Sequence, residues 1–402
     1  MNITSISHRP IGVGGSLAAA LLAAGLQLSL VALPIRSLRA GGANEERNAF
    51  TWNNLQSDIA GVANRTDPNL VNSWGLVINP TASIFWVADN GTGVSTLYRP
   101  NGTPVNLIVT IPTTLADLPP TPGTPPSATP TGIVFNPFAT AFVLPDGQPA
   151  TFIFDGEDGG ISAWNPELSP ITEAIIPISD NSPSGAVYKG LALAYRTSGG
   201  PTLYATNFHN GTVDVFDSSF HLVTATLPAT AFKDPNLPAN FAPFGIANID
   251  GQLYVTFALQ KLPDRHDDQA GPGNGFVDVF DANDGHLVKR LISNGQLNSP
   301  WGLARVPHEF GEFHHKFGGF GPTVLLVGNF GDGKINAYDI NSGNFIDPLK
   351  NRRGEPLDFN GLWALDFLDN RLYFTAGIGD ESHGLFGVIR PVEKEKEEDL
   401  HE

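Results

Sequence analysis

The chain has 402 residues, of which 41% are hydrophobic and 16% charged, and it carries a formal net charge of −17 with no cysteine. The acidic balance argues against nucleic acid as a partner, because that binding depends on Lys and Arg side chains that neutralise phosphates. The absence of cysteine excludes disulfides, thiolate catalysis and cysteine-ligated metal sites. The composition suits a chain that forms a sizeable core and is either kept monomeric by its own charge or collects cations.

The first 43 residues have the pattern of an export signal. A polar start with His8 and Arg9 precedes the apolar run IGVGGSLAAALLAAGLQLSLVAL, and small residues follow up to Ala43. One interpretation is a signal peptide cleaved after Ala43. The other is an uncleaved anchor, because the apolar run is long enough to cross a bilayer, and this would be the chain's only contact with a membrane. Both place the folded part outside the cytoplasm, in a secreted, periplasmic or cell-surface protein.

A short glycine motif recurs six times at near-even spacing. It occurs in SWGLVI, PTGIVF, YKGLAL, PFGIAN, PWGLAR and FNGLWA, with its glycines at Gly75, Gly132, Gly190, Gly245, Gly302 and Gly361. Two further apolar runs follow each copy, such as IFWVAD and VSTLY in the first, and their alternation is typical of strands. Several copies add a weaker fourth run: VNLIVTI, ITEAIIPI, HLVTATL and HLVKRLI. Six units of about four antiparallel strands predict an all-β fold, a six-bladed β-propeller.

We expect an N-terminal strand to close the ring. Copy six ends after HGLFGVI without a fourth strand, and the segment 53–63 has no partner of its own. That segment would complete the outer edge of the last blade, because an unpaired edge strand is a liability. The prediction is a single propeller over residues 52–392, followed by a charged tail at 393–402. Inserts at 115–130, 261–275 and 308–322 widen its loops.

The phrases NLVNSWGL, VADNGTG, LYATNFHNGTVDVFD, GPGNGFVDVFD, SPWGLA and VGNFGDGKINAYD resemble an uncharacterised family of secreted bacterial six-bladed propellers. The resemblance covers roughly residues 52–390. It implies the propeller fold and an exported location, and it implies no reaction. The architecture is more distantly similar to NHL-repeat and gluconolactonase-like propellers, whose metal ligands do not map onto this chain residue by residue.

One set of side chains is expected to line a mouth of the central channel, directly before each repeated glycine. Its members are Trp74, Thr131, Lys189, Phe244, Trp301 and Asn360. Aromatic walls with a single cation would hold an anionic or sugar-like ligand, so Trp74, Lys189, Phe244, Trp301 and Asn360 are the ligand-binding candidates. The alternative is that the aromatic side chains wedge between blades and that Lys189 pairs with a neighbouring acid.

A second set lies at the ends of the second strands. It comprises Asp89, Asp155, Asn207 and Asn329, with Asp380 less securely aligned. Oxygen ligands that converge from several blades would hold Ca²⁺ or Mg²⁺. The alternative is turn chemistry, because Asn-Gly and Asp-Gly pairs follow in these hairpins.

Three loop residues on the same face are weak catalytic candidates: His209, His383 and Glu381. One imidazole would serve as a general base oriented by a carboxylate. The sequence contains no nucleophile elbow, phosphate-binding glycine loop or zinc-protease helix. We therefore expect an exported binding module that takes a small molecule, glycan or protein at its channel mouth. The alternative is a divalent-metal-dependent hydrolase or lyase, and the sequence leaves open whether the protein is an enzyme.

Overall fold

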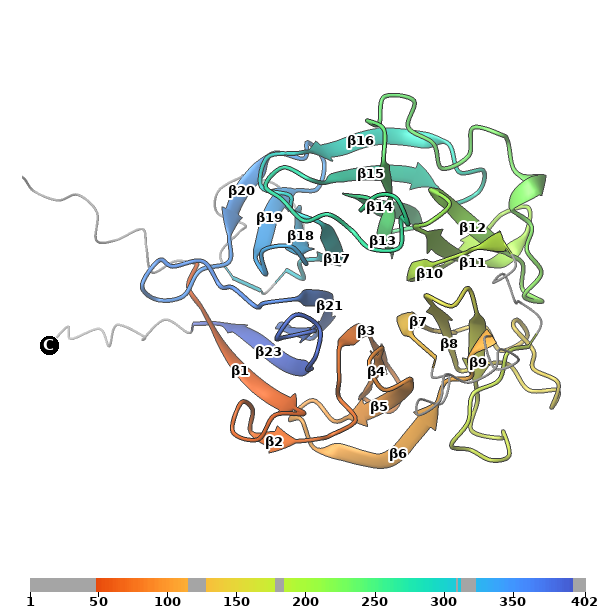
Figure 1. Ribbon diagram of the computed structural model, residues 1–402, viewed down its shortest axis with the longest axis horizontal. Coiled ribbons are helices and arrows are strands. Elements are labelled where there is room, and N and C mark those ends of the chain that lie inside the picture. Colours follow the sequence, from red (N-terminus) through yellow and green to blue (C-terminus); the bar gives the residue numbers. More distant parts are fainter. Residues whose placement is uncertain (1–47, 115–127, 178–183, 309, 312–322, 393–402) are drawn as a thin grey trace, which may run out of the picture. The chain divides into compact units, whose positions relative to one another are not determined.

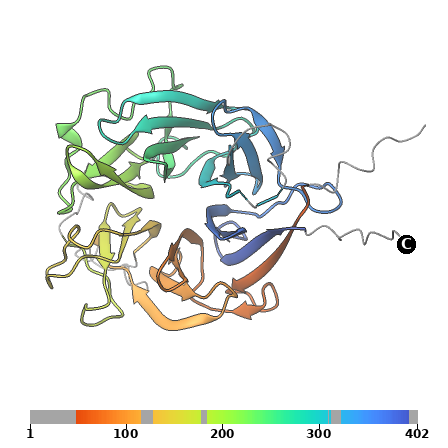
Figure 2. The same cartoon turned by 180° about the vertical axis from the view of Figure 1, so that it is seen from behind.

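The computed structural model describes residues 48–114, 128–177, 184–308, 310–311 and 323–392, all within the unit from Ala43 to Glu402. Within this unit the strands form six sheets around one axis (Figure 1, and Figure 2 from behind). This arrangement confirms the predicted six-bladed β-propeller. The leader at 1–43 and the tail at 393–402 lie outside the described residues. In the described part of the chain, no helix is long and apolar enough to cross a membrane.

Each blade is a sheet whose first strand lies nearest the axis, and its strands pair antiparallel except for the parallel pair of β1 and β2 in blade six. Blade one contains β3 (Ser73–Asn79), β4 (Ile84–Asp89), β5 (Val94–Tyr98) and β6 (Pro104–Thr110). Blade two contains β7 (Pro130–Phe135), β8 (Phe152–Gly156) and β9 (Ile161–Trp164). Blade three contains β10 (Tyr188–Arg196), β11 (Gly200–Asn207) and β12 (Thr212–Phe216).

The second half of the ring repeats this plan. Blade four contains β13 (Phe241–Ile249), β14 (Gln252–Leu259), β15 (Phe276–Asp281) and β16 (Leu287–Ser293). Blade five contains β17 (Pro300–Arg305), β18 (Val324–Asn329), β19 (Ile335–Asp339) and β20 (Phe345–Pro348). Blade six contains β21 (Leu362–Leu368), β22 (Arg371–Ala376) and β23 (Leu385–Pro391), together with β1 (Phe50–Ser57) and the short β2 (Arg65–Thr66).

Two of the four predicted outer strands are not regular strands. In blade two, residues 171–177 make only isolated bridges, one of which joins the neighbouring blade. In blade three, the 3₁₀ turn η3 (Thr224–Thr226) takes the place of the strand. The Oγ1 atom of Thr224 accepts the N–H of Val215, which a fourth strand would otherwise use. A side chain that competes for a ladder hydrogen bond in this way ends regular pairing.

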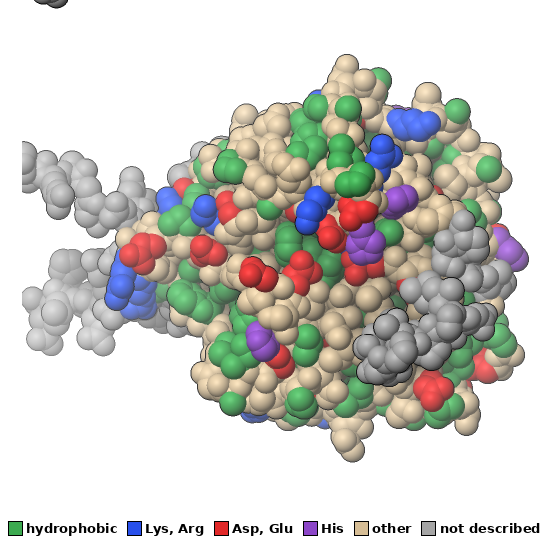
Figure 3. Space-filling model, in the orientation of Figure 1, with side chains coloured by type: hydrophobic (Ala, Val, Ile, Leu, Met, Phe, Trp, Pro, Cys, Tyr) green, Lys and Arg blue, Asp and Glu red, His purple; other side chains and the backbone are tan. Residues whose placement is uncertain are grey.

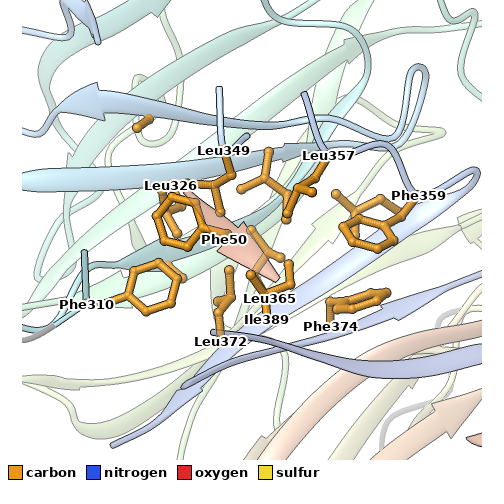
Figure 4. Packing of buried hydrophobic residues seen from close by; sticks show 14 of the residues in the cluster. Phe50, Phe310, Leu326, Leu349, Leu357, Phe359, Leu365, Leu372, Phe374 and Ile389 are labelled. Atoms are coloured by element: carbon orange, nitrogen blue, oxygen red, sulfur yellow. The ribbon is translucent and has the colours of Figure 1, made fainter. Parts of the chain in front are cut away.

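Strand β1 closes the ring as predicted. It pairs antiparallel with β23, from Phe50 opposite Pro391 to Ser57 opposite Leu385 (Figure 1). The strand covers 50–57, so it begins before the predicted segment 53–63 and also ends before it. Hydrophobic packing also stabilises the pairing of β1 with β23. Phe50 enters the cluster between blades five and six (Figure 4), and its ring stacks on Phe310 at 5.1 Å between centroids.

Every inner strand slips by one residue against its neighbour at the same place, which is a β-bulge. The slips lie between Ser73 and Leu76, Pro130 and Ile133, Tyr188 and Leu191, Pro243 and Ile246, Pro300 and Leu303, and Leu362 and Leu365. The repeated glycine of the first five copies lies within the bulge. A Cβ atom on Gly245 would stand 2.2 Å from the carbonyl oxygen of Trp301 in the next blade. The glycine motif therefore marks the points where neighbouring backbones touch.

The register corrects the prediction for the sixth copy. It places Trp363 and Ala364 at the bulge, where the sequence motif suggested Asn360 and Gly361. Gly361 precedes β21 and has a positive φ of 67°. It therefore belongs to a turn. It lies three residues before Ala364, which occupies the position of the repeated glycine in blade six.

Replacing Gly245 by Ala is expected to lower the free energy of unfolding by about 1–3 kcal/mol, because the methyl group forces two blades apart. Chemical denaturation of the purified protein measures the change. Gly199→Ala is the matched control, because its nearest neighbour atom would lie 3.4 Å away, and its effect should stay within about 0.5 kcal/mol. Equal effects of the two substitutions would contradict the close approach.

Candidate functional site

The side chain before each bulge glycine lies on the channel axis. Five members of the predicted first set occupy this position: Trp74, Thr131, Lys189, Phe244 and Trp301. The sixth is Trp363, which the sequence motif missed. Asn360 lies before β21 and accepts a hydrogen bond from the backbone of Gly379. The structure therefore brings five of the six predicted side chains together and replaces the last.

The aromatic members pack against one another. Trp74 stacks on Trp363 with 3.5 Å between centroids, and Trp301 meets both rings edge-on. Phe208, Phe244 and Phe330 complete this group, which we call the aromatic cluster. Trp74, Phe244 and Trp363 are at most 2% exposed. Their packing is the alternative stated above, and these three rings offer no face on which a ligand could stack.

Lys189 is the one charged member of the inner ring, and its charge is compensated. Its side chain is 3% exposed, and its ammonium group forms an ion pair with Glu157. Asp267 Oδ1 lies 3.9 Å from the same nitrogen, which also lies 5.1 Å from the centre of the Trp74 ring. This arrangement is the alternative stated above for Lys189, a salt bridge to a neighbouring acid. It removes the free positive charge that an anionic ligand would need.

Charged side chains from several blades surround Lys189 at one end of the channel. We call the group Glu157, Lys189, His266, Asp267, Asp268 and Glu381 the charged mouth. Acidic side chains gather with His and basic ones over the centre of the ring in Figure 3. The acidic and imidazole groups come from the loops between the second and third strands of blades two, four and six. These loops open on the same face, as predicted.

Hydrogen bonds fix the members of the charged mouth. The Nδ1 atom of His266 lies 2.9 Å from Asp267 Oδ1 and 3.9 Å from Glu157 Oε1. The amide of Asn90 donates to Glu157 over 3.0 Å. The amide of Asn72 donates to Glu381 over 2.9 Å. Blade one thus supplies two amides that orient carboxylates from blades two and six.

The charged mouth holds groups with shifted pKa values. The hydrogen bond with Asp267 raises the pKa of His266, and the same bond lowers the pKa of Asp267. Burial raises the pKa of Asp268 and that of Glu381. The site therefore combines a pair that favours charge with two carboxyl groups that hold a proton more readily than usual. Groups of this kind can bind polar ligands or exchange protons with them.

The predicted metal ligands do not converge. Each of Asp89, Asn207 and Asn329 is bonded within its own blade. The Asp89 carboxylate accepts from Ser73 and Thr96, the Asn207 amide donates to Asp214, and that of Asn329 donates to Asp332. These three occupy the same register position in blades one, three and five, opposite the first residue of the inner strand. Their recurrence is explained by the hairpins they stabilise.

Asp155 lies one position earlier than those three in the register. It accepts hydrogen bonds from Thr131 Oγ1 and from the backbone N–H of Gly132 in the bulge. Its second oxygen is buried without a partner. Burial raises the pKa of this carboxyl to about 7.

Among the described residues, two groups of three titratable side chains could hold a metal ion. They are Glu157, His266 and Asp267, and Asp281, Asp284 and His286. Neither contains a predicted metal ligand. The first belongs to the charged mouth, whereas the second lies in the exposed turn between β15 and β16.

The three catalytic candidates are separated. The structure places Glu381 in the charged mouth. His383 Nδ1 lies 2.6 Å from Asp58, which also accepts the N–H of Gly384, so this pair joins the end of β1 to the start of β23. His209 is part-exposed, and Gln260 donates to its backbone carbonyl. Sequence reasoning missed His266, although the run HDD in the 261–275 insert was a signal for it.

Comparison with known proteins places the chain in a family. No family model matches the sequence. Two uncharacterised proteins of Acanthamoeba polyphaga mimivirus are 30% identical over 353 residues and 32% identical over 354 residues. The first alignment covers 85% of this chain and 81% of the relative, and the second covers 85% and 87%. This chain belongs to their family. The family is therefore represented by viral proteins, and the bacterial, secreted origin suggested by the motifs is not supported.

Solved structures share the fold. An auxiliary nutrient binding protein from Bacteroides ovatus superposes with a TM-score of 0.53 at 10% identity, covering 86% of this chain and 78% of that one. A soluble aldose sugar dehydrogenase from Escherichia coli gives a TM-score of 0.49 at 12% identity, covering 86% and 100%. At 10% identity the likeness to the nutrient binding protein shows the propeller fold alone.

Asp155 should make the stability of the protein depend on pH. Its pKa in the native state lies above its usual value, so the folded protein holds a proton that the unfolded chain has released. The free energy of unfolding should therefore fall as the pH rises from 3.8 to about 7. Asp155→Asn keeps an acceptor for Gly132, removes the part of this fall that Asp155 causes, and should gain about 1–3 kcal/mol over the native protein at pH 8.

Denaturation at pH 5 and pH 8 measures this difference. Asp264→Asn, on the exposed insert, is the control and should keep the native pH profile. A parallel profile for Asp155→Asn and the native protein would exclude the proposed burial of a proton.

Proposed function

We propose that this protein is a binding propeller whose small ligand is held at the charged mouth. The observation that carries the proposal is the convergence of four carboxyl groups, one imidazole and a buried ammonium group at one end of the channel. Only 16% of the residues in this chain are charged, so their concentration at one opening calls for an explanation. Concave sites with convergent polar groups and shifted pKa values are the usual places for small ligands.

The chemistry of the charged mouth favours a ligand rich in hydrogen-bond donors. Carboxyl groups are the most numerous charged groups there, and Asp268 Oδ2 is buried without a partner, whereas the ammonium group of Lys189 is already paired with Glu157. Hydroxyl or ammonium groups would donate to these oxygens. Trp74, Phe244 and Trp363 of the aromatic cluster are buried, so the ligand would be held mainly by polar contacts and not by stacking on these rings. A glycan, a polyol or an amine fits this description.

The second candidate function is a divalent-metal-dependent hydrolase or lyase. One ligand atom each of Glu157, His266 and Asp267 lies within 4.8 Å of the others. A Ca²⁺ or Mg²⁺ ion held there would polarise a carbonyl oxygen or acidify a water molecule. The ammonium group of Lys189 competes for the same carboxylates, so metal binding would require its displacement.

Export remains part of the proposal. It is supported by the pattern of residues 1–43, which lie outside the described residues. We propose a monomer that acts outside the cytoplasm. N-terminal sequencing of the protein isolated from its native source would show whether the chain is cut after Ala43.

A thermal-shift screen tests the binding function. Neutral sugars, polyamines, Ca²⁺ and Mg²⁺ are the probes, because a ligand that binds only the folded state raises the melting temperature. We expect a sugar or polyamine to stabilise the native protein, and Glu381→Gln to reduce that affinity about tenfold or more. Glu167→Gln, on an exposed turn of blade two, is the control and should bind as the native protein does. Stabilisation that survives in Glu381→Gln would place the ligand elsewhere.

Lys189→Met separates the two candidate functions. The substitution leaves Glu157 without its counter-charge, so the free energy of unfolding should fall by about 2–4 kcal/mol without a metal. If the metal-dependent function is right, Ca²⁺ or Mg²⁺ should recover this loss and bind more tightly than to the native protein. Calorimetric titration of both proteins measures this, and an absence of metal binding in both would remove the second candidate.

A further inference from the structure

A second cavity lies in the channel beyond the aromatic cluster. We call it the bowl. It has a volume of about 430 Å³, and the inner strands of all six blades line it. Most of its lining residues follow the bulge in each strand, whereas the charged mouth lies before the bulge. The bowl therefore opens on the opposite face of the ring, and Trp301 from the aromatic cluster forms part of its floor.

The wall of the bowl repeats one aliphatic position around the ring. The six side chains are Leu76, Ile133, Leu191, Ile246, Leu303 and Leu365. Each follows the bulge at the same register position. Each inner strand also ends its sheet, so its edge faces the axis with backbone groups that no further strand pairs. The wall is therefore mainly apolar and carries scattered hydrogen-bonding groups, as small-molecule sites do.

Asp366 is the single ionisable side chain in this lining. It follows Leu365 on β21 and is part-exposed at the wall. Burial raises the pKa of its carboxyl to about 7, although backbone N–H groups of Phe367 and Ile78 lower it. No charged side chain contributes to the shift. An uncompensated carboxyl in an apolar cavity attracts a cation that brings its own apolar surface.

We propose that the bowl binds a small amphiphilic cation, with its apolar body inside the aliphatic ring and its ammonium group on Asp366. The volume lies within the range of ligand cavities, roughly 300–1,000 Å³. Charge complementarity selects the ammonium group, because the lining offers one carboxyl and no positive charge. This site is separate from the charged mouth, and neither proposal depends on the other.

The ionisation of Asp366 governs the binding. A primary amine stays protonated below about pH 10, so only the carboxyl changes its charge between pH 5.5 and pH 8. Opposite Asp366 on β22 lies Tyr373, whose hydroxyl donates to the Pro100 carbonyl and whose pKa is raised from 10.0. On β3 the facing residue is Ile78. No other titratable group of the described residues therefore faces the carboxyl in this range.

Calorimetric titration of the full chain with n-hexylammonium chloride and with 1-hexanol tests the proposal. At pH 8 the ammonium probe should bind about tenfold more tightly than the alcohol, and its affinity should fall about tenfold or more at pH 5.5. Asp366→Asn should bind both probes equally at both pH values. Asp369→Asn, on the exposed turn after β21, removes the same charge outside the bowl and should behave like the native protein.

Two outcomes overturn the proposal. One is native affinity for hexylammonium in Asp366→Asn, which would place the probe elsewhere, for example at the charged mouth. The other is an absence of hexylammonium binding to the native chain at pH 8. Asp366→Glu keeps the charge and should keep the preference for the ammonium probe. It therefore distinguishes loss of the carboxylate from damage to the bowl.

Discussion

The close approach of neighbouring inner strands at the five glycine-containing bulges determines the rest of the structure. A side chain at Gly245 would collide with the backbone of the next blade, so the motif glycines set how tightly the blades close. The bulge also turns the preceding side chain onto the axis, where six such side chains share a narrow space. Three tryptophans and a phenylalanine pack against one another there. The channel is thereby divided into two compartments with different chemistry.

The two compartments differ in whether a charged side chain has a partner of opposite charge. At the charged mouth, burial of Lys189 is tolerated because Glu157 neutralises its ammonium group and Asp267 lies near it. An ammonium group buried without such a partner would cost several kcal/mol. In the bowl, Asp366 has no such partner, and its carboxyl instead holds a proton up to about pH 7. Ion pairing therefore neutralises Lys189 in the charged mouth, whereas the unpaired carboxyl of Asp366 in the bowl can bind a cation.

Periodic features were predictable from the sequence, and features set by irregular loops were not. The spacing of the glycines predicted six blades, and the missing last strand predicted closure by the N-terminal segment. The sixth copy of the motif was placed wrongly because Ala364 stands where the other blades have glycine, while Gly361 lies in a nearby turn. Trp363 was missed for that reason. The Asp and Asn residues before the hairpins recur because each satisfies its own turn.

His266 and its neighbours show why the site itself was harder to predict. They lie in a long insert of blade four, whose path over the channel depends on contacts that no repeat encodes. The pairing of Lys189 with an acid was predicted as an alternative, but the partner was not named. Glu157 follows the second strand of blade two, where only the nearby Asp155 was a predicted site residue. Residues from separate blades meet only once the ring has closed, and sequence spacing does not specify which ones meet.

The pairing of β1 with β23 orders the events of biosynthesis. Phe50–Ser57 is translated before the first five blades, whereas its partner Leu385–Pro391 is translated after them. The ring therefore cannot close until Pro391 has been translated, and β1 keeps an open edge while the five blades form. A nascent chain with this open edge is a substrate for chaperones. Because its ring has not yet closed, the chain can also still pass through a translocation pore.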